Sequence, residues 1–190
     1  MATIAAAAAR PVVARSSIVP GPVTPRLLTR ALDALQQHRG SLAKRDLIGI
    51  ADFSLPSCVP RFHLVNVEDG SVTSHLVAHG RGSDPAHTGW LERFSNEPRS
   101  NATSAGAYKT DGEYIGGHGR SVRLTGLDSS NDNAESRAIV IHGAWYVSDE
   151  MIRDRGMLGR SQGCFAVALS SLDEVLAKLG PGRLIYADKA

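Results

Sequence analysis

The stretch Ile139–Val167, with the sequence IVIHGAWYVSDEMIRDRGMLGRSQGCFAV, decides how the rest of the chain is interpreted. An apolar run ends on His142, a polar segment follows, and the chain returns at residues 161–164 (SQGC) before a second apolar run. This pattern places Cys164 in a glycine-flanked turn between two apolar segments. A thiol is a nucleophile only as its thiolate, and a nearby imidazole or backbone N–H group lowers its pKa into the useful range. The pattern favours a cysteine nucleophile, with a small buried cysteine as the structural alternative.

The chain has two cysteines, Cys58 and Cys164. Gly163 lets the backbone turn sharply before Cys164, and N–H groups at such a turn can face a developing oxyanion. At most one disulfide could form, and we expect an unpaired, reactive Cys164 with Cys58 uninvolved.

The His142-Gly143 pair followed by Ser161-Gln162-Gly163-Cys164 resembles the active-site signature of the L,D-transpeptidases. Further stretches at residues 76–84, 93–96, 103–108 and 138–146 resemble the murein L,D-transpeptidase catalytic-domain-like family. The resemblance covers roughly residues 23 to 190 and implies a β-sandwich or barrel-like catalytic domain. It also implies acyl transfer between peptidoglycan stem peptides through a Cys164 thioester, with His142 as general base and acid.

Two positions depart from the family signature. Gln162 stands where the family has histidine, and because an amide does not titrate, acid–base chemistry falls to His142. Ala166 stands where arginine or asparagine is usual, so a substrate contact must come from elsewhere, and Arg160 is the candidate. The spacer between His142 and Cys164 is also longer than usual, which predicts an extra turn in the loop over the site.

The resemblance implies that the carbonyl of Gly143 orients His142 and that the N–H groups of Gly163 and Cys164 bind the oxyanion. We also predict substrate contacts from five side chains, namely His79, His118, Tyr108, Ser161 and Arg160. Structural roles are the alternatives: core packing for Tyr108, a loop position for His118, turn formation for Ser161 and solvent exposure for Arg160.

The bulk composition is that of a soluble globular protein. A length of 190 residues suits one domain, and contents of 42% hydrophobic and 21% charged residues are ordinary. A net charge of +2 is too small to indicate nucleic-acid binding, and no apolar run is long enough to span a bilayer. We therefore expect one catalytic domain over residues 23–190, a monomer that needs no cofactor or metal.

Residues 1–22 begin with an alanine-rich segment. This segment resembles the end of a secretory signal that lacks its basic start, and a flexible leader is the alternative. Because a family that acts on peptidoglycan must reach its substrate, the resemblance implies export to the periplasm or cell envelope.

Hydrophobic periodicity predicts many short strands and few helices. Leucines at helical spacing follow Thr24-Pro25 and stop before Gly40, while Ser148 and Ser171 are expected to begin two further helices. Predicted strands lie near residues 48–53, 62–67, 72–78, 108–114, 121–127, 137–141 and 184–186, with long loops over 80–106. The fold class is thus mainly β with peripheral helices (α+β).

Other functions fit parts of the sequence. His79, Asp84, His87 and His142 could supply the three ligands of a zinc peptidase, although no short zinc-peptidase motif is present. A catalytically silent peptidoglycan-binding module would explain Gln162 and Ala166. Within the family resemblance, water as the acceptor would make the protein an L,D-carboxypeptidase.

Overall fold

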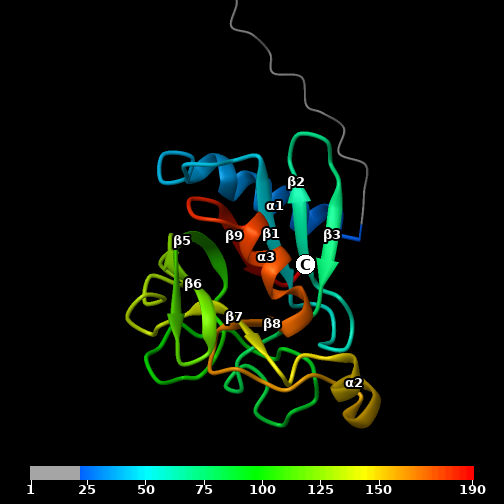
Figure 1. Cartoon of the computed structure of the whole chain (residues 1–190). Coiled ribbons are helices and arrows are strands. Elements are labelled where there is room, and N and C mark those ends of the chain that lie inside the picture. The colour runs from blue at the N-terminus through cyan, green and yellow to red at the C-terminus, as the bar shows by residue number, and fades with distance from the viewer. Residues whose placement is uncertain (1–21) are drawn as a thin grey trace, which may run out of the picture.

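The computed structural model describes residues 22–190, where a nine-stranded sheet is flanked by three α-helices (Figure 1). The leader predicted over residues 1–22 lies, apart from its last residue, outside the described residues. The strands are β1 (Leu47–Asp52), β2 (Phe62–Asn66), β3 (Val72–His75), β4 (Val77–Ala78), β5 (Gly106–Gly116), β6 (Gly119–Gly126), β7 (Val140–Ala144), β8 (Phe165–Ala168) and β9 (Leu184–Asp188). The helices are α1 (Pro25–Gln37), α2 (Asp149–Arg155) and α3 (Leu172–Lys178), and a 3-10 turn, η1, covers Leu169–Ser171. Within this part of the chain, no helix combines the length and apolarity needed to cross a membrane.

The sheet is continuous but open, with the strand order β3-β2-β1-β9-β5-β6-β7-β8-β4. Its two edge strands, β3 and β4, are joined in the chain by the single residue Leu76. The sheet therefore curls back on itself: the rings of Phe62 in β2 and Phe165 in β8 lie 6.4 Å apart, although these strands are near opposite ends of the order. This arrangement confirms the predicted mainly β class with peripheral helices.

The concave side of the curled sheet holds the main apolar core. Tyr108, Ile141 and Phe165 are fully buried there, together with residues of α3. Full burial of one such side chain stabilises the fold by about 1.5–3 kcal/mol. A shift of one residue in strand pairing would turn these side chains to the other face of the sheet, so their burial fixes the register. As a result, the residues that alternate with this core on β7 and β8 face the other side of the sheet.

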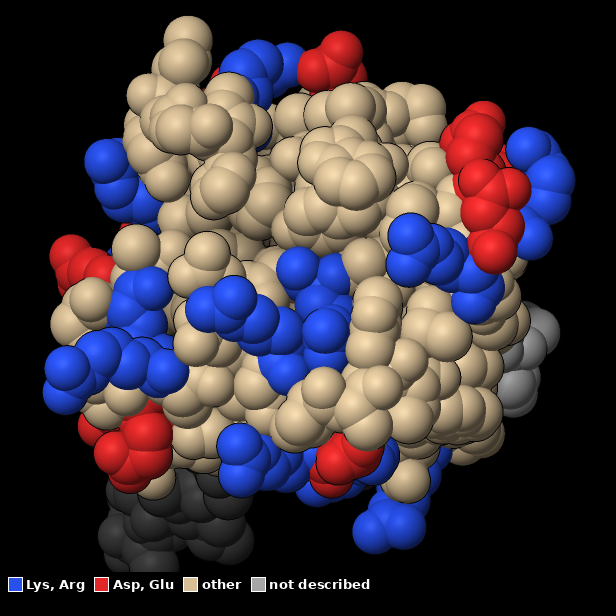
Figure 2. Space-filling view, turned by 90° about the horizontal axis from the view of Figure 1, so that it is seen from below, with Lys and Arg blue, Asp and Glu red and all other residues tan. Residues whose placement is uncertain are grey.

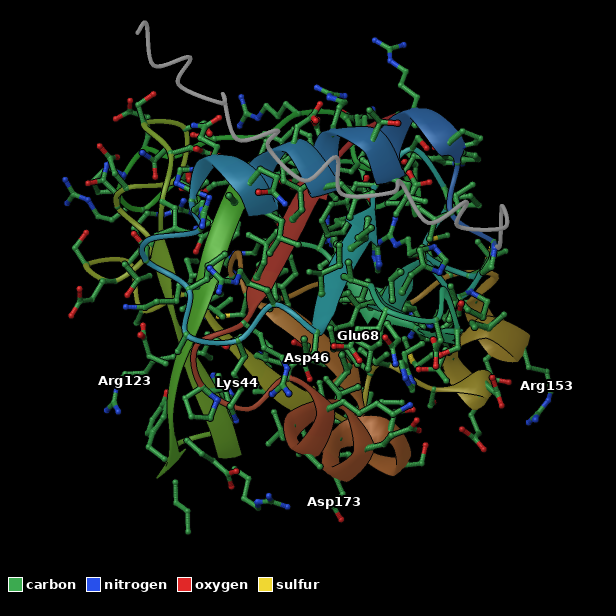
Figure 3. All side chains as sticks on the ribbon, turned by 90° about the horizontal axis from the view of Figure 1, so that it is seen from above. Lys44, Asp46, Glu68, Arg123, Arg153 and Asp173 are labelled. Carbon is green, nitrogen blue, oxygen red and sulfur yellow. The ribbon has the colours of Figure 1, made fainter. Side chains whose placement is uncertain are left out.

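Helix α1 covers a second apolar cluster, and it lies across the top of the sheet in Figure 3. Its start at Pro25 matches the prediction, because proline at the first helical position needs no hydrogen-bond acceptor. Helix α2 also matches: Ser148 Oγ accepts a hydrogen bond from the Met151 N–H at 3.3 Å, and Gly156 ends the helix with φ at 71°.

Three local predictions were wrong. Ser171 directly precedes α3 as predicted, but it has helical dihedrals and its side chain makes no cap hydrogen bond, so the capping expected of a serine at a helix start is absent. The strand expected over 72–78 is divided between the two edges of the sheet. The strand expected from residue 137 begins at Val140, because Ala138 has φ at 53°, which an extended strand cannot contain.

Candidate active site

Strand β7 carries His142, and its neighbour β8 begins directly after Cys164. The two strands run parallel, with Ile141 opposite Phe165 and His142 opposite Ala166. Because side chains alternate along a strand, His142 and Ala166 face away from the core that holds Ile141 and Phe165. Cys164 directly precedes Phe165, and its Sγ lies 3.6 Å from the carbonyl oxygen of Ala138, two residues before β7 begins.

The imidazole of His142 is 98% buried and held in one orientation. Its Nδ1 lies 2.9 Å from the carbonyl oxygen of Gly143. Since a carbonyl only accepts hydrogen bonds, Nδ1 carries the proton and the lone pair of Nε2 remains available. Burial lowers the pKa of His142 below its usual 6.5, which leaves the ring neutral near pH 7.

The ring of His118 stacks on the ring of His142, with centroids 4.3 Å apart and an interplanar angle of 18°. His118 stands at the tight turn between β5 and β6 and is exposed on its outer side. The structure thus places this predicted substrate contact directly against the proposed base, where the hairpin tip covers the imidazole.

The thiol of Cys164 is half-buried, and its Sγ donates to the carbonyl oxygen of Ala138 at 3.6 Å. In the described part of the chain this carbonyl, rather than His142, is its hydrogen-bond partner. Burial raises the pKa of the Cys164 thiol, and this effect outweighs the lowering by the Val140 backbone and by the Arg137 guanidinium. The expectation of a thiolate with a lowered pKa is therefore wrong: desolvation keeps the resting thiol protonated.

The turn before Cys164 is held by Ser161. Its Oγ donates to the carbonyl of Cys164 at 2.7 Å and accepts the N–H of Gly163 at 3.1 Å. Gly163 has φ at 116°, and a Cβ there would lie 2.7 Å from the Ala102 carbonyl oxygen, so only glycine fits. The Gly163 N–H is thus engaged inside the turn, which corrects its predicted oxyanion role and leaves the Cys164 N–H as the predicted donor. Ser161 is buried and positions the turn instead of contacting substrate.

Tyr108 and His79 are likewise corrected, because both are almost completely buried. Tyr108 donates its hydroxyl hydrogen to the carbonyl of Ser104 at 2.8 Å within the core. His79 accepts a hydrogen bond from Arg61 at Nδ1 (2.7 Å), and its Nε2 lies 3.3 Å from Asp84. Burial and the adjacent guanidinium lower the pKa of His79 to about 4, so it remains neutral, and at 1% exposure it has almost no surface for a substrate contact.

Arg160 is partly buried and engaged with the loop beside it. Its Nη1 donates to the carbonyl of Asp84 and, at 3.2 Å, to that of Pro85. Arg160 therefore holds the loop in place. Its Nη1 is occupied by these two carbonyls, so the substrate contact predicted for Arg160 is not available in this structure.

Of the alternative zinc ligands, only His79 and Asp84 lie next to each other. Among residues 22–190, no group of three or more His, Cys, Asp or Glu side chains is placed to hold a metal ion. His87 Nε2 instead donates to the carbonyl of Leu158 at 3.0 Å. The Asp84 carboxylate accepts hydrogen bonds from His79 and from two backbone N–H groups.

One residue near the thiol, Arg137, was missed by sequence reasoning, and Tyr146 was considered only for stacking on substrate or for packing. Arg137 donates to the carbonyl of Ser95 at 2.9 Å and to the hydroxyl of Ser104 at 2.7 Å, which ties the 95–104 loop beneath Cys164. Burial, followed by the nearby Cys164, raises the pKa of the Tyr146 hydroxyl to about 12. Neither residue has a distinctive sequence pattern, since an arginine at a presumed strand start and an aromatic residue after a strand are both common.

The chain belongs to the L,D-transpeptidase catalytic domain family, because the model of that family matches residues 21–187. This match confirms the resemblance seen in the sequence. A comparison with curated protein sequences gives no match.

Solved structures with a similar shape include three from bacteria. An L,D-transpeptidase from Mycobacterium smegmatis is 14% identical, with 75% of this chain and 58% of that chain covered and a TM-score of 0.46. The helical cell shape determining protein Pgp2 from Campylobacter jejuni is 14% identical, with 88% and 57% covered and a TM-score of 0.49. L,D-transpeptidase 3 from Mycobacterium tuberculosis, in complex with a faropenem-derived adduct, is 13% identical, with 76% and 60% covered and a TM-score of 0.48. The chain thus spans less than two thirds of each of these solved chains.

Proposed function

We propose that this protein is a cysteine-dependent L,D-transpeptidase, a transferase that acts on peptidoglycan stem peptides in the periplasm or cell envelope. The proposal rests on the parallel pairing of β7, which carries the buried His142, with β8, which begins directly after Cys164, and on the Gly143 carbonyl that fixes the imidazole. Membership of the family supports the substrate class. The proposed catalytic domain covers residues 23–190.

The reaction begins from a neutral pair. As Sγ of Cys164 attacks the carbonyl of an L,D-peptide bond, Nε2 of His142 takes the thiol proton, and the Cys164 N–H stabilises the oxyanion. The tetrahedral intermediate collapses by breaking the C–N bond, and His142 returns the proton to the leaving amine, which leaves a thioester.

The amine of a second stem peptide then attacks the thioester. His142 accepts the amine proton, the C–S bond breaks, and the proton returns to the sulfur of Cys164. The products are a cross-linked peptide and the original thiol–imidazole pair, so the cycle needs no cofactor, oxidant or reductant.

The test is intact-mass spectrometry of the protein after incubation with a stem tetrapeptide or a carbapenem. We expect a covalent adduct on Cys164, none with Cys164→Ala, and an adduct formed at an unchanged rate with the matched control Cys58→Ser. His142→Ala should slow adduct formation by roughly two to four powers of ten, since general-base assistance is lost.

Mass spectrometry of the released muropeptides identifies the acceptor. Cross-linked products support transpeptidation, whereas a shortened tripeptide alone assigns the L,D-carboxypeptidase reaction. A protein that forms no adduct with either reagent contradicts the proposed function.

A further inference from the structure

A pocket of about 400 Å³ opens beside the candidate nucleophile. It is lined by Pro98, Arg99, Asn101, Ser136, Arg137 and Gln162. Gln162 precedes Cys164 by two residues in the SQGC turn, and Arg137 lies close enough to lower the pKa of the Cys164 thiol. The pocket therefore adjoins the place where the reacting carbonyl would sit.

The pocket is cationic and offers free hydrogen-bond donors. Its lining contains two arginines and no carboxylate. Arg137 is occupied by the carbonyls and hydroxyls of the loop, but in the described chain the side chains of Arg99 and Gln162 have no hydrogen-bond or ion-pair partner. Basic side chains also gather near the middle of the face seen from below (Figure 2). Such a lining favours an anionic group.

The backbone around the pocket is strained. Arg99, Asn101 and Ala138 have φ at 64°, 53° and 53°, respectively. Left-handed backbone costs a non-glycine residue about 1–2 kcal/mol, and such residues persist only where their surroundings hold them. Here the carbonyl of Asn101 accepts the N–H of Gly82 at 2.9 Å, and the Asn101 amide donates to the carbonyl of Arg99 at 3.2 Å. The loop thus presents Arg99 from a fixed backbone.

We propose that this pocket binds a carboxylate of the stem peptide while Cys164 is acylated, with Arg99 as the principal donor and Gln162 as the second. The inference rests on the proposed function, because it names the substrate group that the same site holds. It also accounts for the lack of a donor side chain at Ala166 and for the engagement of Arg160 with the neighbouring loop. A guanidinium can bind a carboxylate through two parallel hydrogen bonds, which would fix the peptide relative to the sulfur.

The experiment compares three forms of one stem tetrapeptide: unmodified, amidated at its terminal carboxyl, and amidated at its acidic side chain. Binding is measured by calorimetry in Cys164→Ala protein, and acylation by intact mass in protein that retains Cys164. The variants are Arg99→Gln, the charge-conserving Arg99→Lys, and Arg153→Gln. Arg153 is the matched control because it is exposed on α2, projects away from the molecule in Figure 3, and carries the same charge.

Arg99→Gln should weaken binding of the unmodified peptide about tenfold, as expected for loss of one charge-assisted hydrogen bond at a partly exposed site. Arg99→Lys should recover part of this loss, and Arg153→Gln should change nothing. One amidated peptide should bind the unaltered protein about tenfold more weakly and be insensitive to Arg99→Gln, which identifies the carboxylate involved.

The proposal that the pocket binds a carboxylate fails if Arg99→Gln weakens binding of all three peptides equally or of none. It also fails if no peptide binds. Arg99-dependent binding without a thioester on Cys164 would instead contradict the proposed function and leave the pocket standing. If the thioester forms on Cys164 but Arg99→Gln affects all three peptides alike, the proposed function stands and the proposed carboxylate pocket is contradicted.

Discussion

Burial sets the resting protonation of both reacting residues. It lowers the pKa of the His142 imidazole and raises the pKa of the Cys164 thiol, so the neutral pair predominates over the thiolate–imidazolium pair. The proton then moves only as sulfur attacks, and the resting thiol is protected from oxidation because thiols react through their thiolates. His118 adds to this setting, since its ring stacks on the base and its positive charge, when present, lowers the pKa of His142 further.

His118 should therefore affect both the rate of acylation and its pH dependence. Loss of an aromatic stack costs about 0.5–1.5 kcal/mol, so His118→Ala should slow acylation roughly two- to twelvefold, whereas His118→Phe keeps the stack and most of the rate. The base works only when unprotonated, so the rate should fall as the pH drops through the lowered pKa of His142, below 6.5. Without the charge of residue 118 that pKa rises, and the acidic limb of the His118→Phe profile should move to higher pH. The pH–rate profile for adduct formation checks this; identical limbs in both proteins would contradict it.

At the scale of elements, the long loops after β4 are held by a buried polar network. Arg61, His79 and Asp84 are each at least 99% buried and follow one another in hydrogen-bonding distance. Asp84 also accepts the N–H groups of Thr88 and Gly89, both at 2.8 Å, which folds the loop back on itself. The network thus fixes the loop to the sheet edge whose neighbouring turn carries Cys164.

Removal of Asp84 should take away one of the two buried carboxylates, with Asp52, whose charges offset that of Arg61, and should leave the N–H groups of His79, Thr88 and Gly89 without their acceptor. We expect Asp84→Ala to lower the free energy of unfolding by about 3–5 kcal/mol, the usual result of breaking a buried charge network. Asp154→Ala is the control, because Asp154 is exposed on α2, and its effect should stay within about 0.5 kcal/mol. Urea unfolding measures both, and equal midpoints for the two variants would show that the network does not stabilise the fold.

At the scale of the whole molecule, Phe165 joins the two halves of the curled sheet. Its ring lies 5.4 Å from that of Tyr108, 6.2 Å from that of Phe53 and 6.4 Å from that of Phe62. Cys164, the proposed nucleophile, is the residue directly before Phe165, so the contacts that join the two halves of the sheet also hold the start of β8 next to Cys164. Stability and activity are therefore coupled at this position.

Phe165→Ala should lower the free energy of unfolding by about 3–5 kcal/mol, because it leaves a cavity between both halves of the sheet. Ile115→Ala provides a comparison at an exposed apolar position on the β5–β6 hairpin, where little change is expected. Thermal unfolding followed by circular dichroism distinguishes the two. A loss below 1 kcal/mol for Phe165→Ala would mean that the halves do not depend on this ring.

The amino-acid sequence by itself determined the fold class, the starts of α1 and α2, and the pair His142 and Cys164, because these depend on short-range spacing. Apolar periodicity and a proline or serine at a helix start are complete within a few residues, and each half of the family motif, residues 142–143 and 161–164, is equally short.

Only the tertiary structure decided which polar residues reach solvent and what charges they carry. Residues 72–78 read as one strand, yet their division between two edges follows from the curl of the whole sheet. Tyr108 and His79 lost their predicted roles through burial by distant segments. The role proposed for Arg99 depends on the 98–102 loop lining one pocket with Gln162, in the turn before Cys164. The physical reason is that desolvation and electrostatic coupling depend on what surrounds a group in space, which its sequence neighbours do not specify.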